Sequence, residues 1–202
     1  AMNPDGNFVV VWTNQEDNAV YMRKFDSEGK EQLKETKVNT SGNANMAAVA
    51  MADDGSYVVT WQNGDVYMRG FDANGKESFA QVKVSNANMQ SNGKRSLPDI
   101  AMDADGNFVI TWEDDADGDG YYDIRARGFN KDGSQRIEEF RVNGNADDQQ
   151  RDPSIAMTST GDSAGAFTIA WEDDTDGNGV FRIRTRSFNT GGSERTADSF
   201  VS

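Results

Sequence analysis

One short pattern occurs four times along this chain, and the repetition limits its possible folds more than any other feature. Each copy starts with Ala-Met and runs through a glycine-containing turn to a strand-like segment that ends in tryptophan. A second segment ends in Arg-x-Phe, and a further turn and strand-like segment follow. The copies start at Ala1, Ala50, Ala101 and Ala156. Tandem units of this length, each too small to bury a hydrophobic face alone, are typical of stacked-sheet arrays.

The segments that end in tryptophan alternate large and small apolar residues. The large positions are Phe8/Val10/Trp12, Tyr57/Val59/Trp61, Phe108/Ile110/Trp112 and Phe167/Ile169/Trp171. Alternate residues of a strand point to opposite faces, and here neither face is charged. We therefore predict all-β structure with sheets packed face to face, as in a β-propeller or a propeller-like array of four four-stranded repeats of about 50 residues. The tryptophans are predicted to fill the core, and the Arg-x-Phe arginines to bind carbonyls or carboxylates between sheets.

The repeats divide the chain into approximate units 1–49, 50–100, 101–155 and 156–202, which we interpret as a single repeat domain over 1–202. The three later Ala-Met pairs follow an apolar residue that reads as part of a first strand, and the first pair has no such residue. Two arrangements stay open, a closed four-unit domain and a segment of a longer array. We expect the segment, with self-association through the terminal repeats because unpaired sheet edges attract partners.

Composition excludes several classes of function. The 202 residues carry a formal net charge of −14 and include neither cysteine nor histidine. Zinc centres and histidine-based catalytic triads therefore need residues that the chain lacks. Nucleic-acid binding is not expected, because phosphate contacts need clustered Lys and Arg. Membrane insertion is not expected either, since no apolar stretch has the necessary length. An acidic, glycine-rich, cysteine-free chain fits a secreted or cell-surface bacterial protein.

The third and fourth repeats have a longer hairpin between tryptophan and Arg-x-Phe, and the third resembles a calcium loop. Carboxylates at alternate positions can converge on one cation, a glycine permits the sharp turn, and a backbone carbonyl can add another oxygen. A solvated acidic turn is the alternative, but clustered carboxylates repel one another without a cation. The predicted ligands are Asp115, Asp117, Asp119, the carbonyl of Tyr121, and Asp123.

This loop and its strands resemble the calcium-binding hairpin of integrin-α (FG-GAP) propeller repeats, and the whole repeat resembles those of large secreted bacterial surface proteins. The resemblance implies the same calcium ligands in the third repeat and an ion that stiffens the propeller without doing chemistry. In the fourth repeat Arg182 replaces the last carboxylate. The partial ligand set that transfers there is Asp174, Asp176, Asn178 and Val180.

The function that these features favour is a non-catalytic, calcium-binding extracellular module for adhesion, binding or assembly, with a glycan or a surface protein as partner. A fragment of a propeller-type carbohydrate-active enzyme and a purely structural spacer are the alternatives. An enzyme of that type needs an acid/base pair held in one pocket. Because the unusual carboxylates all fall in the acidic hairpins, we assign no catalytic residue and predict that the chain is not an enzyme.

Overall fold

The computed structural model describes residues 1–85, 93–116, 118–144, 149–174 and 176–201, and its regular structure consists of fifteen β-strands. Every pair of hydrogen-bonded strands is antiparallel. Among the described residues, no helix is long and apolar enough to cross a membrane. The predicted all-β class is confirmed.

The strands form four sheets, each made from consecutive strands of one repeat. The first sheet contains β1 (Phe8–Asn14), β2 (Ala19–Phe25) and β3 (Glu31–Lys37). The second contains β4 (Asn45–Met51), β5 (Tyr57–Gln62), β6 (Val66–Phe71) and β7 (Glu77–Lys83). The third contains β8 (Lys94–Met102), β9 (Phe108–Asp115), β10 (Asp123–Phe129) and β11 (Gln135–Arg141). The fourth contains β12 (Gln149–Met157), β13 (Phe167–Asp174), β14 (Arg182–Phe188) and β15 (Glu194–Phe200).

The first sheet therefore has three strands where the other sheets have four. Ahead of β1, Met2 forms a single antiparallel bridge with Phe8. Met51 and Met102 occupy matching places in the later repeats, where Met51 pairs with Tyr57 and Met102 pairs with Phe108. Met2 thus marks the place of a first strand in the first sheet.

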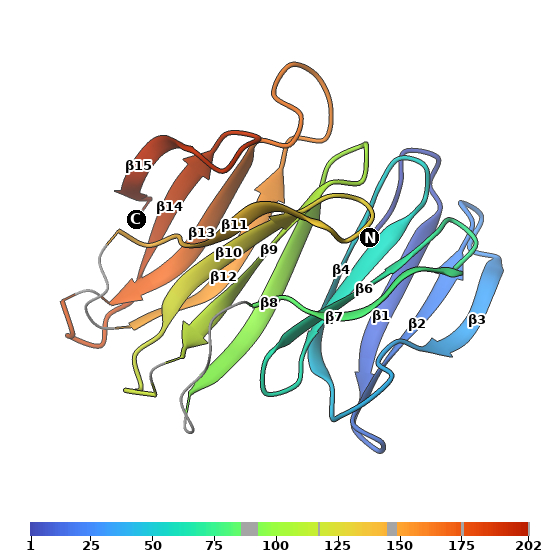
Figure 1. The fold of residues 1–202 in the computed structure, drawn as a ribbon, viewed down its shortest axis with the longest axis horizontal. Coiled ribbons are helices and arrows are strands. Elements are labelled where there is room, and N and C mark those ends of the chain that lie inside the picture. Colours follow the sequence, from blue (N-terminus) through green and yellow to red (C-terminus); the bar gives the residue numbers. More distant parts are fainter. Residues whose placement is uncertain (86–92, 117, 145–148, 175, 202) are drawn as a thin grey trace.

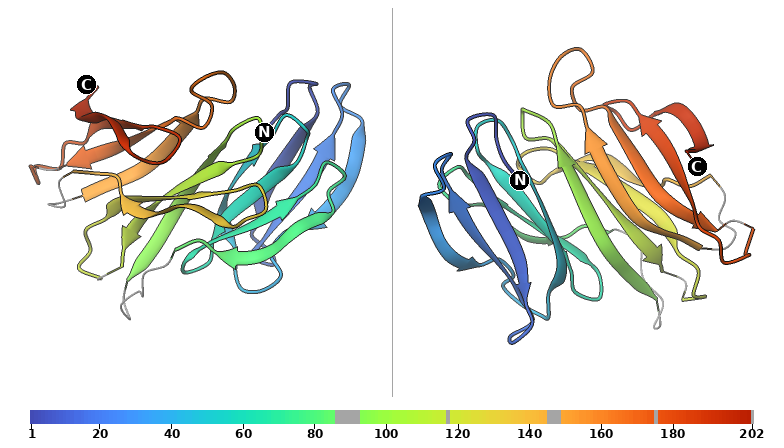
Figure 2. Two further views of the ribbon diagram at one scale, coloured as in Figure 1. Left: turned by 45° about the horizontal axis from the view of Figure 1, so that its top comes forward. Right: turned by 180° about the vertical axis from the view of Figure 1, so that it is seen from behind.

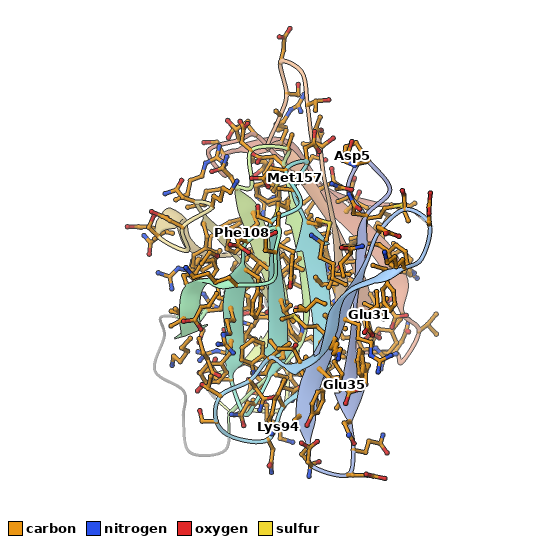
Figure 3. All side chains as sticks on the ribbon, turned by 90° about the vertical axis from the view of Figure 1, so that its right-hand side faces the viewer. Asp5, Glu31, Glu35, Lys94, Phe108 and Met157 are labelled. Carbon is orange, nitrogen blue, oxygen red and sulfur yellow. The ribbon has the colours of Figure 1, made fainter. Side chains whose placement is uncertain are left out.

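The sheets stand side by side in sequence order, from the first sheet at one end to the fourth at the other (Figures 1 and 2). Strands β4, β8 and β12 open the second, third and fourth sheets, and we call them the inner strands because β4 contacts β8 and β8 contacts β12. Figure 3 looks along the stack from the end of the first sheet, so that the two edges of the stack lie at the top and bottom of the view. The Asp5 turn and Met157 lie at one edge, and Lys94 lies at the other.

The second and third sheets each pack one face on the preceding sheet and the opposite face on the following one, while the first and fourth sheets each pack on a single neighbour. The large face carries the aromatic, Val/Ile and Trp side chains, and the small face carries the residues between them. Three apolar clusters join the small face of one sheet to the large face of the next. Trp61, Trp112 and Trp171 are at most 1% exposed, which confirms their predicted place in the core. Trp12 is only partly buried, because no sheet covers the large face of the first sheet.

The Arg-x-Phe arginines bind between sheets, as the sequence predicts. In three sheets the arginine donates to the carbonyl of the valine that follows the last strand of the preceding sheet, at 2.6–2.7 Å. We call this contact the arginine clamp; its pairs are Arg69 to Val38, Arg127 to Val84 and Arg186 to Val142. Hydrogen bonds from a charged donor stabilise a fold more than neutral ones. Each of the three interfaces therefore contains one such charged hydrogen bond at the same repeat position.

Candidate functional site

The three inner strands share a β-bulge at one matching position. In β4, Asn45 pairs with Gln62 but Ala48 pairs with Thr60, so one extra residue lies in the inner strand. The same shift occurs in β8 and in β12. Each bulge holds a residue other than glycine in the left-handed region, and these are Met46 (φ 48°), Leu97 (φ 47°) and Asp152 (φ 50°). Bulges of this kind re-aim side chains, and they are over-represented next to active sites.

These bulges are strained. A left-handed conformation costs a residue with a side chain roughly 1–2 kcal/mol. Pro98 and Pro153 follow two of the bulge residues, and proline further disfavours compact conformations in the residue before it. Strained backbone persists only where the surrounding structure holds it, and such positions cluster at functional sites. Three strained residues at one repeated position therefore mark a candidate site.

The bulges line an open groove of about 280 Å³ that crosses the inner strands, and we call it the inner groove. Its lining is mainly apolar and contains two carboxylates. The lining residues are Met46, Ala47, Leu97, Pro98, Asp99, Asp152 and Pro153. An apolar surface with a few fixed polar groups is the usual character of a small-molecule site.

The Asp99 carboxylate connects the third and fourth sheets. Its Oδ1 accepts a hydrogen bond from the amide of Ile100 at 2.9 Å. Its Oδ2 accepts from the amide of Ile155 at 3.0 Å and from the hydroxyl of Ser154 at 3.2 Å. With both oxygens accepting hydrogen bonds from the protein, Asp99 serves to hold β8 and β12 together at the groove.

Glu113 supports the groove from behind, and Asp152 faces solvent. The Glu113 side chain is buried, its Oε2 accepts from the Ser96 hydroxyl at 2.7 Å, and its Oε1 accepts from the amide of Asp152 at 2.9 Å. A charged acceptor on this amide stabilises the strained backbone of Asp152. The Asp152 side chain itself is 55% exposed, and its nearest cation is the Arg151 Nε at 4.0 Å. Asp152 is thus the carboxylate of the groove that is open to a ligand.

The structure places the predicted calcium ligands of the third repeat on both sides of one hairpin. Asp115 is buried at the end of β9, and its Oδ1 accepts from the amide of Gly120 at 3.3 Å. Asp119 accepts from the amide of Tyr121 at 2.8 Å, two residues further along the loop. Asp123 accepts from Asn143 at 2.8 Å and lies 3.9 Å from Arg141. Asp117 lies outside the described residues.

The hairpin of the fourth repeat folds in the same way at its start. Asp174 is buried, and its carboxylate accepts from the amides of Asn178 and Gly179 at 3.0–3.2 Å. Asn178 accepts from the amide of Val180 at 2.7 Å, and Asp176 lies 3.7 Å from Arg182. Within the ranges that the structure describes, which omit 117 and 175, no three acidic side chains lie close enough to hold a metal ion. The calcium site stays a prediction.

A buried ion network lies between the second and third sheets. Arg95 is fully buried and donates to Asp65 at 3.0 Å and to Asp114 at 3.2 Å. Burial raises the pKa of the Asp65 carboxyl, but bonds from Ser85, Lys83 and the Val66 amide and the charge of Arg95 bring it below its ordinary value. Burial outweighs the nearby arginines at Asp114, whose pKa is raised. This network is structural, because its groups are all committed to one another.

Sequence reasoning missed the inner groove because it looked for carboxylates that cluster along the chain. Asp99, Glu113 and Asp152 lie in three different strands and meet only when the sheets stack. One signal was present in the sequence. Pro98 and Pro153 occur at matching places before Ala-Met, inside runs that otherwise read as strand. Proline within a sheet is confined to edges and bulges, so the pair indicates two bulges at equivalent positions.

Comparisons with known proteins give likenesses in structure alone. No protein-family model matches this sequence, and no curated protein matches it. An α-L-arabinofuranosidase from Fusarium graminearum, solved with an iminosugar inhibitor, has a TM-score of 0.64 at 12% identity over 100% of this chain. An α-L-arabinanase from Penicillium chrysogenum, solved with arabinobiose, has a TM-score of 0.63 at 11% identity over 99% of this chain. This chain spans 64% of the length of each.

A third solved structure, the Dos1 propeller, has a TM-score of 0.52 at 14% identity and covers 95% of this chain and 46% of its own. Identities this low establish a common fold and no more. The structural likenesses correct two expectations from the sequence, the integrin-type resemblance and the prediction of a non-enzyme. The three structures are two arabinose-acting enzymes and the Dos1 propeller rather than integrin-type calcium repeats, so the FG-GAP resemblance was wrong. They include two carbohydrate-active enzymes, so the fold gives no ground for predicting a non-enzyme, and that prediction was wrong as well. The chain has the fold of a β-propeller.

Proposed function

We propose that this chain is part of a carbohydrate-active β-propeller and that the inner groove binds a pentose-containing oligosaccharide. The observation that carries the proposal is the threefold strained bulge, which brings an apolar floor and the exposed Asp152 carboxylate into one open groove. Two structures of the same fold, an arabinanase and an arabinofuranosidase, were solved with arabinobiose and with an iminosugar. This supports the carbohydrate-active alternative over an adhesion module.

The groove offers what a sugar ring requires. Met46, Leu97 and the two prolines present apolar surface on which the C–H face of a sugar can lie. Asp152 can accept hydrogen bonds from hydroxyl groups, and the Arg151 guanidinium beside it can donate them. Glycosidases use a pair of carboxylates at the scissile bond. We assign Asp152 the contact with the glycan, and Glu113 the positioning of Asp152 through its amide.

Asp152→Asn is expected to weaken the binding of arabino-oligosaccharides about 10-fold or more, since a hydrogen bond to a charged group contributes roughly 1.5–3 kcal/mol. Isothermal titration calorimetry with arabinobiose and longer arabino-oligosaccharides measures the change, and product analysis of the same mixtures reports any cleavage.

Asp162→Asn is the matched control, because Asp162 is exposed and does not line the groove. It should leave the affinity unchanged. Equal affinities for the two variants would contradict the role of Asp152, and the lack of binding to any oligosaccharide tested would contradict the proposed function.

We also propose that the acidic hairpin of the third repeat binds calcium. The proposal is supported by the loop sequence and by the shared start of both hairpins, where Asp115 and Asp174 are buried and turn inward. Asp123 is engaged with Asn143 and Arg141, so the described carboxylates alone do not form a complete cage. An extracellular location, where calcium is abundant, stays a prediction from composition.

Calcium is expected to raise the melting temperature, by an amount equivalent to about 2.7 kcal/mol at a hundredfold excess over the dissociation constant. Asp117→Ala should remove most of this shift, and Asp176→Ala should remove less, because Arg182 already occupies the final ligand position of the fourth loop. Differential scanning calorimetry with calcium, with magnesium and with a chelator provides the measurement. Identical melting curves with calcium and with chelator would refute the calcium site.

A further inference from the structure

The two ends of the stack leave opposite faces uncovered. At one end lies the large face of the first sheet, and at the other lies the small face of the fourth sheet (Figure 1). Val10 on this large face is 44% exposed, whereas its equivalents Val59, Ile110 and Ile169 are fully buried. Ile183 on the small face is 37% exposed, whereas Val20, Val66 and Ile124 at the matching position are fully buried. The open faces are therefore the two halves of the interface that occurs three times inside the chain.

The small face of the fourth sheet contains a hollow where the next sheet would insert. In the second sheet, Ala50 and Val58 pack with Phe108 of the third sheet. The matching residues of the fourth sheet, Ala156 and Thr168, instead line an open cavity of about 520 Å³. Phe8 is the residue of the first sheet that matches Phe108, and it lies on the uncovered large face. The phenylalanine at the matching repeat position and an open cavity are thus present at opposite ends of the stack.

The arginine clamp is also divided between the two ends. Arg23 matches Arg69, Arg127 and Arg186 in the repeat, but within the described chain no sheet precedes the first one to offer Arg23 a valine carbonyl. Its described partners are Glu31 at 3.7 Å and Glu35 at 3.9 Å. At the other end, Val201 matches Val38, Val84 and Val142, and it is 63% exposed where they are fully buried. No arginine within the described chain donates to the Val201 carbonyl.

We propose that the uncovered faces bind each other in two copies of this chain, head to tail, so that the large face of one copy's first sheet covers the small face of the other's fourth sheet. The contact would repeat the interface already formed three times within the chain, with Phe8 in the open cavity and Arg23 donating to the Val201 carbonyl. Because each copy keeps one free face of each kind, the association is heterologous and extends beyond a dimer.

Sedimentation velocity over a concentration series at about 0.15 M salt tests this, since salt at that level screens the repulsion between acidic copies. The wild-type chain is expected to form dimers and larger species as concentration rises. Val10→Glu blocks only the large face and Ile183→Glu only the small face, so each variant alone is expected to be monomeric. A mixture of the two is expected to form a 1:1 dimer and nothing larger, since one intact face of each kind remains.

Val82→Glu is the matched control. Val82 is 41% exposed on the outer strand β7, away from both end faces, so this variant should associate like the wild type. Circular dichroism should give the three variants the same folded spectrum. A wild-type chain that stays monomeric at all concentrations overturns the proposal. A mixture of Val10→Glu and Ile183→Glu that stays monomeric also overturns it, because the end faces then do not pair with each other.

Discussion

Replacing Arg95 by glutamine is expected to lower the free energy of unfolding by about 3–5 kcal/mol, which is the typical cost of breaking a buried ion pair from one side. Arg95 is fully buried and neutralises Asp65 and Asp114, whose side chains are 9% and 1% exposed. Glutamine is a suitable replacement because the fold already accommodates it at the matching position of the fourth sheet. There Gln150 accepts a hydrogen bond from Asn143 through its Oε1. The loss then reflects two buried carboxylates that keep only Lys83 and Arg125 as cationic partners, and not a clash of shape.

The pH dependence of this loss follows from the two carboxylates. The pKa of Asp65 is lowered in the fold, so its charge stabilises the protein above the unfolded pKa of about 3.9 and this contribution is lost as pH falls through the folded pKa. The pKa of Asp114 is raised, so its buried charge costs stability as pH rises. Without Arg95 each carboxylate loses one cationic partner, so its charged form is less favourable in the fold. The deficit of Arg95→Gln should be largest near neutral pH and shrink as the carboxyls protonate in acid.

Urea denaturation of the wild type and the variant at pH 7 and near pH 4 gives both quantities. Arg141→Gln is the control, because Arg141 is 39% exposed and lies 3.9 Å from its partner Asp123. Pairs of that kind contribute about 0–1 kcal/mol. A deficit for Arg95→Gln as small as the control would show that the buried network does not hold the second and third sheets together.

Trp112→Ala is expected to cost about 3–5 kcal/mol, because it removes a fully buried indole between the second and third sheets. Trp12→Ala changes the same repeat position in the first sheet, where the ring is only partly buried and stacks on Tyr21 at 6.1 Å. We expect it to cost less than half as much. Denaturation at a low protein concentration, where the chain is monomeric, compares them. Equal losses would mean that the first sheet's large face is covered in solution.

Much of the fold could be predicted because it depends on a short pattern that occurs four times. Alternation of large and small apolar residues fixes which side of each sheet meets its neighbour, and the buried Trp61, Trp112 and Trp171 bear this out. The role of the Arg-x-Phe arginines was also predictable. A charged group followed two residues later by a core phenylalanine lies beside the interface and needs an acceptor there, and the carbonyl of the preceding sheet provides it.

The candidate site was harder to predict because it depends on register and stacking. The groove arises from bulges in β4, β8 and β12. A bulge places one extra residue in a strand, and this leaves no distinctive residue composition in the sequence. Its carboxylates acquire their roles through contacts between sheets. Glu113, for example, accepts a hydrogen bond from the backbone amide of Asp152 in the next sheet. The acidic hairpins are recognisable from the sequence because their carboxylates lie close together along the chain. That adjacency also suggested an integrin-type repeat, which the structural likenesses contradict.

Hydrogen–deuterium exchange with and without a saturating arabino-oligosaccharide tests most directly whether a glycan binds in the inner groove. Backbone amides report ligand contact along the whole chain without any substitution. We predict slower exchange at the three bulges, in peptides that cover 45–48, 96–99 and 151–154, with no change in the hairpin between β9 and β10. Slower exchange in that hairpin with unchanged bulges, or no change anywhere in the chain, would contradict glycan binding in the inner groove.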